Sequence, residues 1–137
     1  MARFIKQRTR FDCGIAAAAI ALDTSYQKTR KLWYSIRPDT ACLTTRGIRL
    51  EEMEQLLQTS EAPWISWVEK DFSQASTLTR WKPKAPLNII LTWQGEGYCG
   101  HWISVCHGIA YDPHHDGPRL PQDTLRAPHS VIGGFFL

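Results

Sequence analysis

The sequence predicts a single α+β domain in which helices come first and antiparallel strands follow. Residues 13–58 hold an alanine-rich apolar run and two further stretches with helical patterns, whereas 64–137 hold short apolar runs separated by glycine and proline. Hydrophobic residues make up 43% of the chain and charged residues 21%, which is ordinary for a globular protein. A chain of 137 residues suits one domain with its own core, and we assign residues 1–137 to it.

The first expected helix contains Ile15–Leu22, which is apolar on every side and should therefore be buried at the centre of the domain. Asp12 is a good N-cap residue, and Cys13 would lie in the first turn. Unpaired backbone N–H groups and the positive end of the helix dipole favour a thiolate at such a place. Taken alone, this position also suits a cysteine that is only a small buried hydrophobic residue.

Two more helices are expected before the strands begin. The second should cover 26–36, capped by Ser25 or the threonine before it, and end ahead of Pro38, because proline disfavours helix in the residue that precedes it. The third should cover 51–58 and is amphipathic. Its apolar residues share one helical face: Leu50, Met53, Leu56 and Leu57.

Strands are expected in the second half of the chain, at 64–68, 87–93, 101–106, 109–112 and 130–137. The dipeptide His107-Gly108 predicts a tight turn, which makes a hairpin of the third and fourth strands. Residues 71–84 are compatible with a short helix and a loop, and 113–128 with a proline-bearing loop. The hairpin would bring His101 and Asp112 to its open end, where they are neighbours if they share a face.

Four side chains supply the groups needed for acyl transfer through a cysteine nucleophile: Gln7, Cys13, His101 and Asp112. The thiolate attacks a carbonyl carbon, the imidazole takes and returns a proton, and the carboxylate fixes the imidazole tautomer. The amide of Gln7 and the backbone N–H groups at the helix start would face the developing oxyanion. With all four groups in the chain, a catalytic Cys13 is favoured over a merely buried one.

The order of these motifs resembles the papain-like cysteine peptidases that occur as the N-terminal domain of bacteriocin exporters and as free-standing bacterial proteins. The resemblance spans nearly the whole chain and is carried by Gln7, Asp12-Cys13-Gly14, Gly47-Ile48 with Leu50, Gly100-His101-Trp102 and Tyr111-Asp112-Pro113. It implies a papain-like fold, with N-terminal helices packed on a C-terminal antiparallel β-sheet. It also implies a cysteine peptidase acting on a peptide or protein substrate, since exporter members cut leader peptides after a double glycine.

Carried over residue by residue, the resemblance implies Cys13 as the nucleophile, His101 as the general base and acid, and Asp112 as the residue that orients the imidazole. Gln7 would complete the oxyanion hole with the backbone N–H of Cys13. No metal and no organic cofactor is implied. Residues that adjoin the nucleophile and the imidazole in the sequence are assigned to substrate binding: Asp12, Gly100 and Trp102. No transmembrane or ATPase segment follows, so we expect a free-standing member rather than a transporter-coupled one.

The charge and the cysteine spacing argue against several other classes. The net charge of +3 is too small to imply nucleic acid by itself. A basic cluster near the start is expected to be a solvated face, with a surface for an acidic substrate or for nucleic acid as the alternatives: Arg3, Lys6, Arg8 and Arg10. The four cysteines form no C-x-x-C pair, so no zinc site is predicted. Neither a membrane-spanning run nor a signal peptide is evident, which makes a cytoplasmic protein the default.

Two alternatives to a peptidase stay open. A protein deamidase or a transglutaminase-like acyltransferase uses the same Cys-His-Asp logic, and a fold does not fix the reaction. The chain could instead be a non-catalytic binding or inhibitory effector, for example one encoded by a phage or a mobile element, that retains the fold. The sequence identifies neither the substrate nor the oligomeric state.

Overall fold

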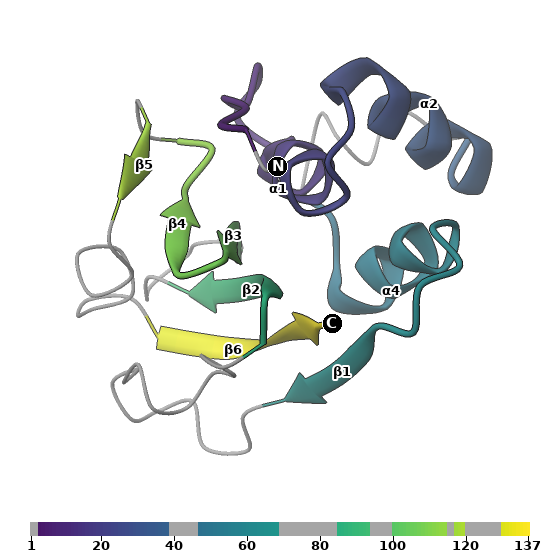
Figure 1. The fold of residues 1–137 in the computed structure, drawn as a ribbon. Coiled ribbons are helices and arrows are strands. Elements are labelled where there is room, and N and C mark those ends of the chain that lie inside the picture. The colour runs from purple at the N-terminus through teal and green to yellow at the C-terminus, as the bar shows by residue number, and fades with distance from the viewer. Residues whose placement is uncertain (1–2, 39–46, 69–84, 94–99, 115–116, 120–129) are drawn as a thin grey trace.

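A computed structural model describes residues 3–38, 47–68, 85–93, 100–114, 117–119 and 130–137. In these residues three helices are followed by six strands (Figure 1). The helices are α1 (Cys13–Ala21), α2 (Tyr26–Ile36) and α4 (Leu50–Gln58). The strands are β1 (Ile65–Val68), β2 (Leu87–Trp93), β3 (His101–Cys106), β4 (Ile109–Tyr111), β5 (Pro118–Arg119) and β6 (Ser130–Phe136).

The six strands form one sheet in the order β1-β6-β2-β3-β4-β5, and every neighbouring pair is antiparallel. The sheet curves around the helices, which all lie on one of its sides (Figure 1). The C-terminal strand β6 lies between β1 and β2. The first strand and the last strand of the chain are therefore neighbours in the sheet. The predicted α+β class, with helices first and an antiparallel sheet second, is confirmed.

Helix α1 is the centre of the core, because all nine of its residues are buried, as predicted for a helix that is apolar on every side. Its small side chains allow a close approach to the sheet, where the Ser104 hydroxyl on β3 donates to the Ala17 carbonyl at 2.6 Å. Gly14 marks a close contact: a Cβ there would lie 3.0 Å from Cδ1 of Ile48 and 3.1 Å from Cδ1 of Trp102. The start of α1 is thus pressed against the start of β3.

A two-residue turn sets the register of β3 and β4. The dipeptide His107-Gly108 has φ angles of 51° and 80°, as in the type I′ turns that suit twisted antiparallel strands. The register pairs Ser104 with Tyr111. Asp112, the next residue after β4, therefore lies diagonally opposite His101 on the same face of the hairpin.

The expected helices after α1 are confirmed. Helix α2 covers the predicted residues 26–36, and the Ser25 hydroxyl caps it by accepting a backbone N–H at 3.1 Å. Helix α4 begins at Leu50, one residue earlier than expected, and buries Glu52 together with its apolar face. The carboxylate of Glu52 is paired with the guanidinium of Arg37 at 3.2 Å, which offsets part of the free energy lost by burying a charge.

The expected strands are found, with small differences at their ends. Strands β2 and β3 have the predicted bounds, whereas β1 begins at Ile65, β4 ends at Tyr111 and β6 ends at Phe136. The short strand Pro118–Arg119 lies inside the predicted loop, and both residues are exposed, so no apolar pattern indicates it. The stretch 71–84 lies outside the described residues. No helix in the described part of the chain is long and apolar enough to cross a membrane.

Candidate active site

The four residues predicted to act together belong to separate parts of the fold. Cys13 is the first residue of α1, His101 is the first residue of β3, and Asp112 directly follows β4. Gln7 belongs to the segment 3–12 ahead of α1, which we call the strap. Figure 1 shows the strap beside the loop that follows β4.

His101 and Asp112 are joined directly. Nε2 of His101 lies 2.6 Å from Oδ1 of Asp112, and 3% of the carboxylate side chain is exposed against 18% of the imidazole. The same Oδ1 accepts the backbone N–H of His114 at 2.9 Å. A carboxylate held in this way fixes which ring nitrogen carries the proton. Because Nε2 is taken by Asp112, Nδ1 is the ring nitrogen left for the nucleophile.

Cys13 lies against the start of β3, where His101 begins. Its Sγ accepts the backbone N–H of Trp102 at 3.5 Å, a distance suited to a sulfur acceptor. The residue is 4% exposed and stands in the first turn of α1, where the helix dipole and the unpaired N–H groups favour negative charge. The thiol also interacts with the imidazole of His101 and helps to raise its pKa. Thiol, imidazole and carboxylate therefore form one connected series.

The pKa of His101 reflects both neighbours. Burial by itself lowers this pKa, but hydrogen bonds to Asp112 and Cys13, together with the negative charges of both groups, raise it from the ordinary 6.5 to about 10. An imidazole with a raised pKa keeps its proton at neutral pH, so the site holds an imidazolium beside the carboxylate of Asp112.

Gln7 is tied to this site through its backbone. Its N–H donates to the carbonyl of Pro113 at 2.9 Å, directly after Asp112. Its side-chain Nε2 donates to the carbonyl of Thr9 at 2.8 Å, while Oε1 is buried without a hydrogen-bond partner. A primary amide has two N–H donors, and the contact with Thr9 uses one of them. The oxyanion role of Gln7 stays a prediction.

Asp12 occupies the N-cap position of α1, but its side chain makes no hydrogen bond to the helix, so the predicted side-chain cap is wrong. The carboxylate turns back and accepts the backbone N–H groups of Arg8, at 3.1 Å to each oxygen, and of Thr9, at 2.9 Å. It also accepts the hydroxyl of Tyr26. With 2% of the residue exposed and these donors bound, the geometry favours a structural role over the predicted contact with substrate.

Trp102 and Gly100, both assigned to substrate binding from the sequence, lie in close packing at the start of β3. The Trp102 ring is fully buried, its Nε1 donates to the carbonyl of Ile48 at 2.8 Å, and it stacks on Phe135. Trp102 therefore contacts Cys13 through its backbone N–H, while its ring packs in the core. A Cβ on Gly100 would lie 2.5 Å from Cδ1 of Leu91 and 3.2 Å from the carbonyl oxygen of Thr92, so a side chain at this position would require the Leu91 side chain to shift.

Two residues close to the site, His114 and Tyr26, were not predicted from the sequence to belong to it. The ring of His114 meets the ring of His101 edge-on, with 6.3 Å between the centroids. Extending the hairpin register would have placed these two histidines opposite each other. Tyr26 was expected only as the start of a helix, and its contact with Asp12 depends on how α2 packs, which no local pattern reveals.

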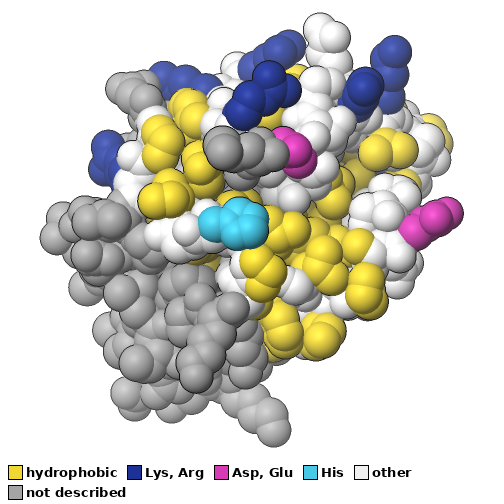
Figure 2. Space-filling view, viewed as in Figure 1, with side chains coloured by type: hydrophobic (Ala, Val, Ile, Leu, Met, Phe, Trp, Pro, Cys, Tyr) yellow, Lys and Arg dark blue, Asp and Glu magenta, His cyan; other side chains and the backbone are white. Residues whose placement is uncertain are grey.

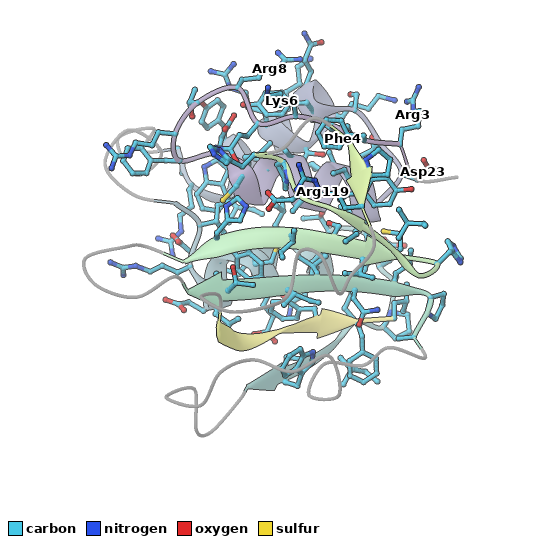
Figure 3. The ribbon with its side chains drawn as sticks, turned by 90° about the vertical axis from the view of Figure 1, so that its left-hand side faces the viewer. Arg3, Phe4, Lys6, Arg8, Asp23 and Arg119 are labelled. Atoms are coloured by element: carbon cyan, nitrogen blue, oxygen red, sulfur yellow. The ribbon has the colours of Figure 1, made fainter. Side chains whose placement is uncertain are left out.

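The predicted basic cluster is exposed, with its four members spread along the strap: Arg3, Lys6, Arg8 and Arg10. Figure 2 shows Lys and Arg side chains gathered over the strap and α2 on the face in view. Figure 3 shows Arg3, Lys6 and Arg8 following one another along the strap, with Arg119 of β5 below them. The Arg8 guanidinium lies 4.2 Å from the centre of the Tyr26 ring. A solvated face and a surface for an acidic substrate both stay predictions.

Among the described residues, no group of three His, Cys, Asp or Glu side chains could hold a metal ion. Cys42 and Cys99 lie outside the described residues, and the other two cysteines, Cys13 and Cys106, are both free and buried. In comparisons with protein-family models and with curated proteins, no family model and no curated protein matches this chain.

Proposed function

We propose that this chain is a cysteine-type peptidase or amide hydrolase with a papain-like fold. One observation carries the proposal: the imidazole of His101 is bonded to the carboxylate of Asp112, Nε2 to Oδ1 at 2.6 Å, while Cys13 Sγ accepts the N–H of Trp102, the residue next to His101, at 3.5 Å. Three groups from three separate elements meet in the chemical order that nucleophilic catalysis requires. A purely structural histidine needs only one of these partners.

In the proposed reaction the Cys13 thiolate attacks the carbonyl carbon of the substrate, and the C=O double bond opens to an oxyanion. The imidazolium of His101 then gives its proton to the departing amine as the C–N bond breaks, which leaves a thioester on Sγ. Water attacks the thioester while the neutral imidazole takes its proton. The thiolate leaves, the carboxylic acid is released, and the imidazolium is restored.

The oxyanion would be stabilised by the backbone N–H of Cys13, one of the unpaired donors of the first turn of α1, and by the amide of Gln7. Such donors are typically worth a factor of about 100–1,000 in rate each. No step requires a metal or an organic cofactor. The order of elements supports the proposed membership among bacteriocin-processing peptidases, since a buried helix bearing the cysteine packs on an antiparallel sheet bearing the histidine and the carboxylate.

The proposal is tested by exposing the protein to a library of peptides from a digested proteome and identifying new chain ends by mass spectrometry. We expect cleavage by the wild type and none by Cys13→Ala or His101→Ala, provided that both variants show the wild-type thermal unfolding curve. Release of ammonia without new chain ends would identify the reaction as deamidation instead of peptide-bond hydrolysis. If the wild type formed neither product, a binding protein that retains the fold would be favoured.

A further inference from the structure

We propose that Asp12 and Tyr26 are positioning residues for the oxyanion site, because they hold the turn of the strap that presents the amide of Gln7. The inference rests on the proposed function, because it assigns residues to the same site. It does not require the substrate to be known.

The turn is built around one buried carboxylate. Asp12 accepts backbone N–H groups from Arg8 and Thr9, at 2.9–3.1 Å, and the hydroxyl of Tyr26. Asp12 is 2% exposed and Tyr26 is 7% exposed. A carboxylate is buried at this depth only when donors surround it, so these contacts act together and removing one weakens the hold of the others.

The turn reaches Gln7 through a single residue. The N–H of Thr9 is bound by Asp12, and the carbonyl of Thr9 accepts Nε2 of Gln7 at 2.8 Å. The backbone N–H of Gln7 is held on the other side by the carbonyl of Pro113. Gln7 is therefore fixed at two points, and one of them depends on Asp12.

The same carboxylate links the amide to the nucleophile. Asp12 directly precedes Cys13, and its carbonyl accepts the N–H of Ala16 at 3.2 Å, which is the first bond of α1. Tyr26 adds the start of α2 as a third anchor. Burial and the hydrogen bond to Asp12 raise the pKa of the Tyr26 hydroxyl, so it stays a donor across the ordinary pH range. Oxyanion donor and thiol are thus placed relative to each other by one buried network.

The test compares two reactions of the same thiol. p-Nitrophenyl acetate acylates Sγ through a tetrahedral oxyanion, forming the S–C bond and releasing p-nitrophenolate. Iodoacetamide alkylates Sγ by displacement of iodide, and no oxyanion develops. Both rates are measured on the full chain, with the Cys13→Ala background subtracted. A defect in the oxyanion site lowers the first rate and spares the second.

We expect Tyr26→Phe to lower acylation about tenfold and to leave alkylation within about twofold of the wild type. Gln7→Ala should show a larger loss with the same selectivity. In the double variant Gln7→Ala/Tyr26→Phe the tyrosine substitution should have no further effect, because it acts through the amide that is already absent. Tyr34→Phe is the matched control, because Tyr34 lies on the same helix and its hydroxyl accepts a hydrogen bond from the exposed Arg30 rather than from the strap.

The inference is overturned if Tyr26→Phe lowers both reactions alike, lowers neither, or lowers acylation equally in the Gln7→Ala background. If Tyr26→Phe does not fold, Asp12→Asn is put through the same comparison with the same criteria. A wild type that is alkylated but never acylated at Cys13 would remove the proposed function itself. That result differs from acylation that is intact and insensitive to Tyr26, which removes the positioning role alone.

Discussion

The imidazole of His101 and the carboxylate of Asp112 meet at 2.6 Å across the open end of the β3–β4 hairpin, eleven residues apart in the chain. A type I′ turn at His107-Gly108 fixes the register that brings them together. The contact is sheltered, since 3% of the carboxylate side chain is exposed. Charge on Asp112 therefore acts on the imidazole with little screening by water.

Asp112→Asn should slow catalysis and thiol modification together. The substitution keeps the shape of the side chain but removes the negative charge that raises the pKa of His101. We expect peptide cleavage to fall by at least about tenfold, and the alkylation of Cys13 at pH 6–7 to slow as well. The measurement is the rate of each reaction against pH. Asp23→Asn, at an exposed carboxylate, is the control and should match the wild type.

The stability of the protein should depend on pH through His101. Its pKa is about 10 in the folded protein and about 6.5 when unfolded, so the native state binds the proton more strongly than the unfolded state does. This contribution is complete below pH 6.5 and is lost as the pH rises through 10. Urea unfolding from pH 6 to pH 10.5 should show a free energy of unfolding that declines across this range.

The comparison variant for this pH dependence is His101→Gln. Other groups also titrate near pH 10, and the difference in the free energy of unfolding between the wild type and His101→Gln isolates the contribution of the histidine. This difference in free energy should become smaller as the pH rises from 6.5 to 10. A difference that stays constant with pH would show that the pKa of His101 is the same in the folded and unfolded chains.

Gly14→Ala should destabilise the fold. The added methyl group would lie 3.0 Å from Cδ1 of Ile48 and 3.1 Å from Cδ1 of Trp102, closer than ordinary packing allows. We expect a loss of about 1–3 kcal/mol in the free energy of unfolding, measured with urea. Gly117→Ala is the matched control, because a Cβ there meets nothing within 4 Å. Equal stability of the two variants would contradict the close contact of α1 with β3.

Cys106 should be inert in the folded protein. Burial and the negative charge of Asp23 raise the pKa of its thiol to about 12. We therefore expect iodoacetamide at pH 8 to leave Cys106 unmodified in the native chain and to modify it in urea, as read by peptide mass spectrometry. If Cys106 were labelled as fast as Cys13 in the native protein, that result would contradict the protection of the Cys106 thiol by burial and by its raised pKa.

The helices and inner strands could be predicted because their signals are local. The apolar run at Ile15–Leu22 fixes a buried helix, and His107-Gly108 fixes a hairpin whose register brings His101 to Asp112. The strand Pro118–Arg119 could not be predicted, because two exposed residues carry no apolar pattern.

The finer parts of the site depend on tertiary packing. The Asp12 carboxylate bonds to Tyr26, fourteen residues away on another helix, instead of capping α1. A preference for N-cap residues cannot foresee this choice, because it depends on where α2 lies. Likewise, the ring of Trp102 is buried in the core, where it donates a hydrogen bond to the carbonyl of Ile48 and stacks on Phe135.

The most direct test of a thiolate–imidazolium pair is the rate of iodoacetamide alkylation at Cys13 against pH, in the wild type and in His101→Ala. Peptide mass spectrometry separates Cys13 from the other three cysteines, and Cys106 serves as the internal reference. The proposed site predicts fast modification well below pH 8 that collapses when His101 is removed. Slow modification that is unchanged in the variant would contradict it.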